Sequence, residues 1–244
     1  MNYFEYSGVK SSDMGLRIEK KNVFSAPKYD LSFQEIPGRN GDLIIPNGRY
    51  PNIQITYTVF LPAKTAAELA DKVTAVKNWL YAGQDRYHEL RDTYDTKFTR
   101  KAVFANKLNI EDELGKIGTF TVSFSCQPFR YAVDGQSDVT MINGGLLVNP
   151  YAFPSKPLVK IKGSGDSVLR VISSSTSEIK EWKLTGISSS LYIDSEIMNC
   201  YKGATPMNDH VSGDGFPVLQ PGDNYILWNE GITEVKIVPR WCSL

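Results

Sequence analysis

Two histidines are the residues with which this chain could most readily bind a metal or move a proton, since imidazole does both near neutral pH. His88 precedes Asp92 by four residues, which on a helix would place both side chains on one face. Gly83 ends the preceding helical pattern, so we expect His88 in a loop, exposed or in packing. His210 stands in a polar, glycine-rich loop that lacks the spacing and final glutamate of a calcium site. We therefore predict no metal and no cofactor.

The sequence also lacks the motifs that build common active sites. It contains no Gly-x-Ser-x-Gly, no phosphate-binding loop, no His-Glu-x-x-His and no dinucleotide-binding glycine pattern. Three cysteines, Cys126, Cys200 and Cys242, are far apart and odd in number, which favours buried thiols in a reducing compartment. Cys126 ends an alternating segment, so we predict a small core residue rather than a nucleophile. No catalytic residue is predicted, and we expect that the protein is not an enzyme.

Aromatic residues leave a binding function open. An indole ring packs well against the face of a sugar, so Trp182 and Trp228 are candidates for a saccharide contact. Both residues lie within strand patterns, however, where filling a core or an interface is the simpler explanation and the one that we favour.

Composition and charge limit the classes of partner that we expect for this protein. The chain has 244 residues, with 27 basic and 27 acidic side chains, so its formal net charge is +0. Phosphate binding needs a basic surplus or patch, and we therefore expect no specific nucleic acid partner. No apolar run approaches the roughly 20 residues of a membrane helix, so we expect no membrane either. The first residues carry no signal-peptide pattern.

One stretch, residues 32–80, organises the first half of the chain. A turn-rich loop at residues 36–42 precedes the apolar run at residues 43–45. A second turn at Asn47-Gly48 leads into residues 53–60, where apolar and polar side chains alternate. Asn-Gly pairs accept the positive φ that tight turns require, and alternation at period two indicates a half-buried strand.

The clearest predicted element is a helix at residues 65–81. Thr65 and Glu68 form a capping box at its start, and Gly83 follows its end. Its apolar side chains recur at helical spacing: Leu69, Val73, Val76 and Leu80. A single amphipathic helix among strands must bury its apolar side on a sheet. We therefore predict an α+β N-terminal domain in which one helix packs on a sheet.

The rest of the chain predicts further strands. Residues 118–126 alternate strictly, and we expect Pro128 to end that strand. Residues 133–157 have little periodicity and several prolines, which predicts a linker between domains 1–132 and 158–244. Short strands separated by turns then predict a C-terminal β-sandwich and a mostly β protein.

Two polar segments are expected to divide the strands of the C-terminal domain. Gly163-Ser164-Gly165-Asp166 has the composition of a turn between two short apolar segments. Ser188-Ser189-Ser190 is expected to be the tip of a hairpin. On this interpretation every strand of the domain is short.

Several of these segments resemble the distal tail protein family of long-tailed phages that infect Gram-positive bacteria. In the first half, the loop Gly38-Arg39-Asn40-Gly41 is similar to the Gly-Arg-Asp-Gly of many members, with Asn40 in place of the aspartate. The helix end Trp79-Leu80 and the strand end Phe124-Ser125-Cys126-Gln127-Pro128-Phe129 also resemble the family. In the second half the similar segments are Asn149-Pro150 through Gly163, Ile193-Asp194-Ser195-Glu196, Phe216-Pro217-Val218-Leu219-Gln220-Pro221-Gly222-Asp223-Asn224 and Pro239-Arg240-Trp241.

The resemblance implies a baseplate hub of the virion, in which N-terminal domains form a hexameric ring and galectin-like C-terminal β-sandwiches lie outside it. It implies a homo-hexamer whose partners are the tail tube protein, the tail-associated fibre or lysin protein and the tape-measure protein. The location is then the tail tip, after synthesis in the host bacterial cytoplasm. Gly38, Arg39, Asn40 and Gly41 are candidates for the oligomer interface, with an exposed turn as the other interpretation. The alternative function is a carbohydrate-binding module for host cell-wall saccharide.

Overall fold

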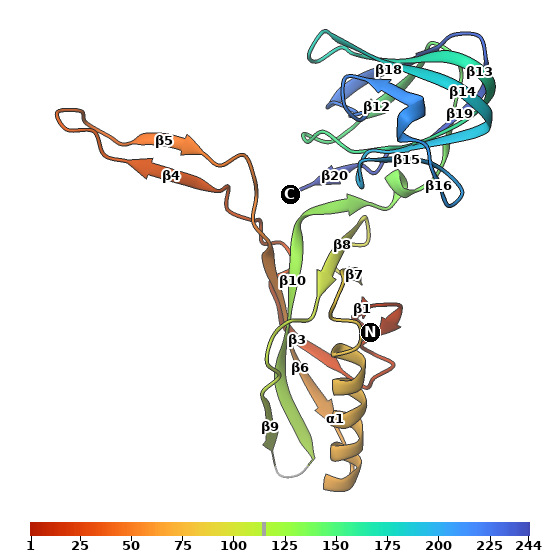
Figure 1. The fold of residues 1–244 in the computed structure, drawn as a ribbon. Coiled ribbons are helices and arrows are strands. Elements are labelled where there is room, and N and C mark those ends of the chain that lie inside the picture. Colours follow the sequence, from red (N-terminus) through yellow and green to blue (C-terminus); the bar gives the residue numbers. More distant parts are fainter. Residues whose placement is uncertain (114–115) are drawn as a thin grey trace. The chain divides into compact units, whose positions relative to one another are not determined.

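The structure is a computed structural model that describes residues 1–113 and 116–244. The chain divides into two compact units, Met1–Arg130 with Leu244 and Tyr131–Ser243. Both units are built mostly from strands, and the described residues hold one α-helix, α1 (Ala66–Leu80), in the first unit (Figure 1). The mostly β fold class is therefore confirmed. No helix within the described residues is long and apolar enough to cross a membrane.

The first unit contains one large sheet and a separate hairpin. The strands that the first unit contributes to the sheet are β1 (Phe4–Tyr6), β2 (Val9–Lys10), β3 (Arg17–Lys21), β6 (Ile53–Pro62), β7 (His88–Asp92), β8 (Phe98–Val103), β9 (Ile110–Glu113) and β10 (Ile117–Ala132). They follow the order β2-β1-β7-β8-β10-β6-β3, with β9 also paired to β10. The hairpin consists of β4 (Leu31–Gln34) and β5 (Leu43–Pro46), which within the described residues pair only with each other.

Alternating side chains of β6 and β10 form the centre of the first core. The two strands pair antiparallel, with Tyr57 opposite Val122 and Ile55 opposite Phe124. These four side chains are fully buried, and each contributes about 1.5–3 kcal/mol by leaving water. The expectation that Pro128 ends the strand was wrong, because β10 continues to Ala132. Pairing with β6 stops earlier, at Cys126, so the missing N–H of Pro128 interrupts no hydrogen bond of that ladder.

Helix α1 begins as the capping box predicts. The hydroxyl of Thr65 accepts a hydrogen bond from the backbone N–H of Glu68 at 3.2 Å. The carboxylate of Glu68 accepts from the backbone N–H of Lys64 at 2.8 Å, one residue before the cap. The indole N–H of Trp79 donates to the carbonyl of Tyr6 in β1 at 3.1 Å. The buried side chains Leu69, Val76 and Leu80 join the core of the sheet, which confirms a helix packed on strands.

The second unit is built from strands and two short 3-10 helices. Its elements are η1 (Asp134–Gln136), β11 (Val139–Met141), β12 (Gly145–Asn149), β13 (Leu158–Ser173), β14 (Glu178–Asp194), β15 (Asn199–Lys202), β16 (Thr205–Pro206), η2 (Asn208–His210), β17 (Val211–Gly213), β18 (Gly222–Trp228), β19 (Ile232–Val238) and β20 (Cys242–Ser243). The main path is β11-β19-β13-β14-β15-β16, while β18 pairs with both β12 and β13, and β17 with β14.

The residues expected to form a linker, 133–157, are instead part of the second unit. They contain β11, which pairs with β19, and β12, which pairs with β18. Met141 and Leu147 are buried among the apolar side chains of this unit. Strands of three and five residues are too short to show periodicity in the sequence. The prolines were therefore the clearest signal in residues 133–157, and they indicated a linker. The division of the structure after Arg130 lies two residues before the expected end of the first domain at 132.

The expected turns within the second unit are parts of two long strands. Gly163 lies inside β13 at a register shift, and Ser189 lies opposite it inside β14. A Cβ atom at Gly163 would lie 2.1 Å from the carbonyl oxygen of Gly231, so this position requires glycine. The glycine therefore marks an irregular point where two backbones approach closely, rather than a reversal of the chain.

Candidate assembly interface

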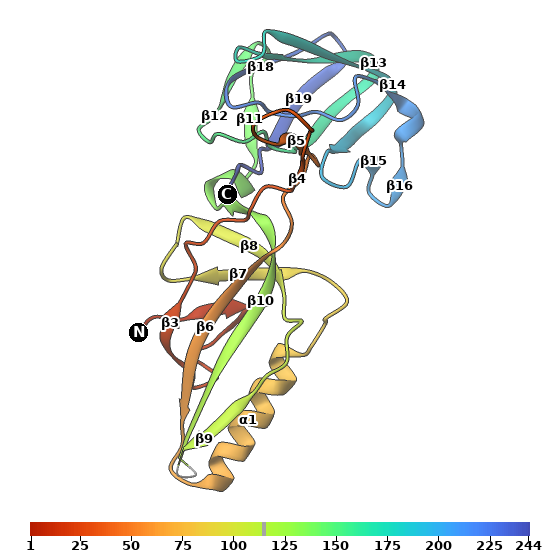
Figure 2. The same ribbon diagram turned by 90° about the vertical axis from the view of Figure 1, so that its left-hand side faces the viewer.

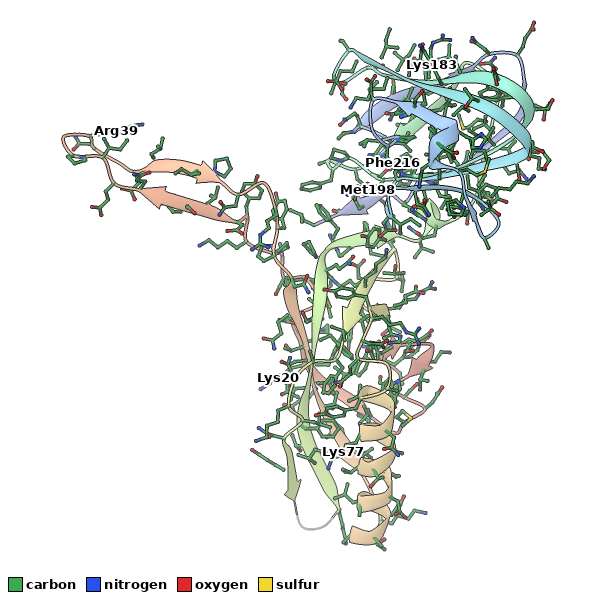
Figure 3. All side chains as sticks on the ribbon, viewed as in Figure 1. Lys20, Arg39, Lys77, Lys183, Met198 and Phe216 are labelled. Carbon is green, nitrogen blue, oxygen red and sulfur yellow. The ribbon has the colours of Figure 1, made fainter. Side chains whose placement is uncertain are left out.

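The predicted interface residues lie at the end of a hairpin that projects from the first unit. Strands β4 and β5 pair in register, with Phe33 opposite Ile44 and Gln34 opposite Leu43. The loop that joins them is exposed along its whole length. Figure 3 shows Arg39 at the far end of the hairpin, away from the sheet of the first unit. The structure therefore brings the four predicted residues together on one exposed tip.

Glycines shape this tip. Gly38 and Gly41 have φ angles of 80° and 81°, in the left-handed region that L residues rarely adopt. Between them, the backbone N–H of Arg39 donates to the carbonyl of Ile36 at 3.1 Å and closes a turn. The turn expected from the sequence is therefore present, and it directs the guanidinium of Arg39 into solvent.

The strands of the hairpin carry apolar side chains that the first unit does not bury. Phe33 and Ile44, opposite each other on one face, are 57% and 58% exposed. Leu43 and Ile45 are exposed on the other face. An isolated two-stranded hairpin is marginally stable in water, and an exposed apolar surface marks a site of interaction. Another protein surface would supply the burial that this hairpin lacks.

A polar cluster fixes the root of the hairpin. The carboxylate of Asp30 accepts from Nδ2 of Asn47 at 2.9 Å and from Nε of Arg49 at 2.7 Å. These hydrogen bonds, first that of Asn47 and then that of Arg49, lower the pKa of Asp30 below its ordinary value. The ring of Tyr50 packs edge-on against Phe129 of β10, with 5.8 Å between ring centroids. The direction of the hairpin is therefore set by contacts at its base.

Sequence reasoning missed strand β4 and the residues of the root. Residues 1–31 have an extended pattern, but nothing in them indicates a strand that begins at Leu31, and Asp30 is separated from Arg49 by 19 residues. The available signal was a pair of opposite charges that flank two apolar segments joined by a glycine-rich turn. Such charges at the open end of a hairpin lie across from each other and attract.

The two tryptophans proposed for saccharide binding lie on one row across three strands. Leu169 of β13 is opposite Trp182 of β14 on one side and opposite Trp228 of β18 on the other. Trp182 is 1% exposed, and its indole N–H donates to the carbonyl of Gly215 at 2.5 Å. Its ring therefore presents no face to solvent. Trp228 is half-buried, and the saccharide contact stays a prediction for that residue.

The two ring nitrogens of His88 take part in local hydrogen bonds. His88 begins strand β7, so its expected place in a loop was wrong. Its Nε2 lies 2.7 Å from the carbonyl oxygen of Gly83, and its Nδ1 lies 3.1 Å from Oγ of Ser7. Asp92 accepts from the phenol of Tyr57 at 3.0 Å. Within the described residues, no three His, Cys, Asp or Glu side chains gather as a metal site would require.

Comparisons with known proteins bear on this geometry. Residues 6–126 match the family model of the phage tail protein RIFT-related domain. The Dit protein of phage SPP1, described as a paradigm of the hub adsorption apparatus in phages that infect Gram-positive hosts, matches with a TM-score of 0.80 and 15% identity over 100% of both chains. Two structures of the phage p2 baseplate in its activated conformation, with Sr and with Ca, give TM-scores of 0.54 and 0.52 at 7% identity and 97% coverage of each chain. No curated protein sequence matches.

Proposed function

Because residues 6–126 match the family model of the phage tail protein RIFT-related domain, we propose that this chain is the structural hub of a long, non-contractile tail tip. Six copies form a ring that joins the tail tube to the baseplate or tail-fibre protein. The fold that the whole chain shares with the SPP1 Dit protein supports this role. The main observation in support of the proposed ring is the projecting apolar hairpin.

The hairpin β4–β5 is the surface through which neighbouring copies meet in this proposal. A ring requires a heterologous contact, in which one surface of a copy meets a different surface of the next. The hairpin supplies such a surface, because its apolar faces are exposed while its root at Asp30 is fixed. Arg39 at the tip adds a planar group suited to carboxylates or aromatic rings of the neighbour.

The remaining partners follow from the position of a hub. The ring contacts the tail tube protein on one side, and the tail-associated fibre or lysin protein on the other, with the tape-measure protein at its centre. Its place is the tail tip of the virion, and its function is binding rather than catalysis. A formal net charge of +0 suits a passage that does not retain DNA.

The mass of the purified protein, measured by light scattering on a sizing column, tests the ring. The wild type is expected near six times the chain mass of 27.3 kDa. Phe33→Asp with Ile44→Asp is expected to give monomers, because charges replace the exposed apolar contact without touching the core. Ile197→Asp, at another exposed apolar residue, is the matched control. A wild type that stays monomeric at its highest soluble concentration contradicts the ring.

The alternative function, binding of cell-wall saccharide, would rest on Trp228. Its half-buried ring is the part of the predicted tryptophan pair that solvent can reach. Titration calorimetry with wall polysaccharides tests it directly. Saturable heat that Trp228→Ala removes would support this function, and the absence of heat across the panel would exclude it.

A further inference from the structure

Strand β12 has an open border in the second unit. It pairs with β18, and no strand within the described residues pairs with its other side (Figure 2). Its sequence, Gly-Leu-Leu-Val-Asn, contains no charged residue. Leu146 and Val148 are each 48% exposed, whereas Leu147 between them is buried. The border therefore offers unpaired backbone groups beside an exposed apolar face.

The apolar face continues from this border into the sheet. Leu146 lies opposite Tyr225 of β18, Tyr225 lies opposite Ile172 of β13, and Ile172 lies opposite Ile179 of β14. Side chains directly opposite in a ladder point to the same face, so these four form one row. Leu146, Tyr225 and Ile179 are exposed, and Ile172 is half-buried. A strand added beside β12 would extend this row by one side chain.

The border strands β3 and β9 carry charges instead. Strand β3 has the sequence Arg-Ile-Glu-Lys-Lys, and β9 has Ile-Glu-Asp-Glu. Charged residues on a border strand prevent pairing with another chain. Among described strands of four or more residues, β4, β5 and β12 alone combine an open border with the absence of charge. Among these longer described strands, the hairpin and β12 are therefore the uncharged surfaces that suit strand addition.

We propose that strand β4 of one copy adds to the open border of β12 in a second copy. Strand β5 is less suited because Pro46 has no backbone N–H to donate, whereas all four residues of β4 have one. Strand addition joins backbone groups by hydrogen bonds, and side chains at alternate positions determine its specificity. Leu31 and Phe33 share one face of β4, and that face continues the row that begins at Leu146.

The contact deepens the proposed ring and rests on it. It joins two different surfaces of the chain, as a closed ring requires. The lengths agree, since a strand of four residues pairs with a strand of five. The occupant of β12 is therefore the hairpin of a neighbouring copy.

Cross-linking between two co-expressed variants tests the pairing. One variant carries Leu31→Cys and a size tag, and the other carries Val148→Cys without a tag, because both side chains lie on the shared face of the proposed pairing. A short bismaleimide is expected to join one tagged and one untagged chain, and the mass of this product lies between those of two tagged and two untagged chains. The three native thiols are buried, so they should not contribute to the product. Ile197→Cys replaces Val148→Cys in the control, since Ile197 is also exposed but lies in the turn between β14 and β15. Equal yields from the two pairs would overturn the proposal.

A variant with charged residues in β12 tests the pairing with β12 independently of the ring itself. Leu146→Lys with Val148→Lys is expected to convert the ring into monomers, with an unchanged far-UV circular dichroism spectrum, because both side chains are outside the core. If that variant still forms the ring while Phe33→Asp with Ile44→Asp does not, the hairpin docks elsewhere and the pairing with β12 is wrong. If the wild type is monomeric, the ring itself is wrong.

Discussion

The guanidinium of Arg240 holds the carboxylate of Asp194 through two parallel contacts, Nη1 to Oδ1 at 2.6 Å and Nη2 to Oδ2 at 3.0 Å. Asp194 is buried and Arg240 nearly so, and Glu196 lies 3.6 Å from the same guanidinium. The backbone N–H of Arg240 donates to the carbonyl of Gly135 at 2.7 Å. This bidentate pair fastens the C-terminal segment to the end of β14, so two segments noted in the sequence meet in space.

Removing the carboxylate of this pair should destabilise the second unit. Asp194→Ala leaves a largely buried guanidinium without its main partner, and we expect a loss of about 3 kcal/mol in the free energy of unfolding. Urea denaturation followed by tryptophan fluorescence measures it, since Trp182, Trp228 and Trp241 lie in this unit. Glu181→Ala, which breaks the exposed pair with Arg170, is the control and should cost less than about 1 kcal/mol.

The same pair should make the stability of the second unit depend on pH. Burial alone would raise the pKa of Asp194, but hydrogen bonds from Arg240 and from the amides of Glu196 and Ile197, with the charge of Arg240, outweigh it and lower the pKa below 3.8. A lowered folded pKa stabilises above 3.8, and this contribution is lost as pH falls through the folded value. Urea midpoints measured from neutral pH to below 3.8 should fall less steeply in Asp194→Asn than in the wild type. Parallel curves would contradict the assignment.

The cap of α1 should contribute measurably to the first unit. Thr65→Ala removes the hydroxyl that accepts from the N–H of Glu68, and we expect a loss of about 1 kcal/mol. Thr74→Ala is the control, because its hydroxyl donates to Ala70 in the middle of the exposed helix face. That substitution should be neutral or slightly stabilising, since alanine favours helix. Thermal denaturation of both variants provides the comparison.

The cysteines should not react with thiol reagents in the folded protein. Burial raises the pKa of Cys126 to about 12, despite the nearby charge of Arg100. Burial also raises the pKa of Cys200 and Cys242 to about 11. The thiolate is the reactive form, so at neutral pH the native chain should react at the rate of its unfolding. Rapid modification of one thiol before unfolding would show an accessible cysteine.

Local signals explain which elements the sequence predicted. The helix at α1, the alternation of residues 53–60 and the glycine turn around Arg39 each depend on neighbours within a few residues. The strand at His88 could not be predicted in this way, because β1, distant in sequence, supplies its backbone partners on one side. The continuity of β13 and β14 likewise depends on Gly163 meeting Gly231, which lies far along the chain.

The candidate interface was predicted only at its tip for the same reason. Gly38 and Gly41 identify a turn from their own residue types. The root required Asp30 to meet Asn47 and Arg49, which is a relation between segments. The exposure of Phe33 could not be predicted, because an apolar residue in a sequence usually indicates burial.

The exposure of the hairpin β4–β5 has a consequence for how the sequences of related tail proteins can diverge. Its exposed side chains belong to neither hydrophobic core, so substitutions such as those at Phe33 or Ile44 change little in the folding of the chain. In the proposed ring, folding and the choice of the neighbouring subunit are thus encoded in separate residues. In the proposed ring, small changes in this hairpin would be sufficient to keep the subunits of two phages in one cell from mixing, while the scaffold that carries the hairpin stays the same.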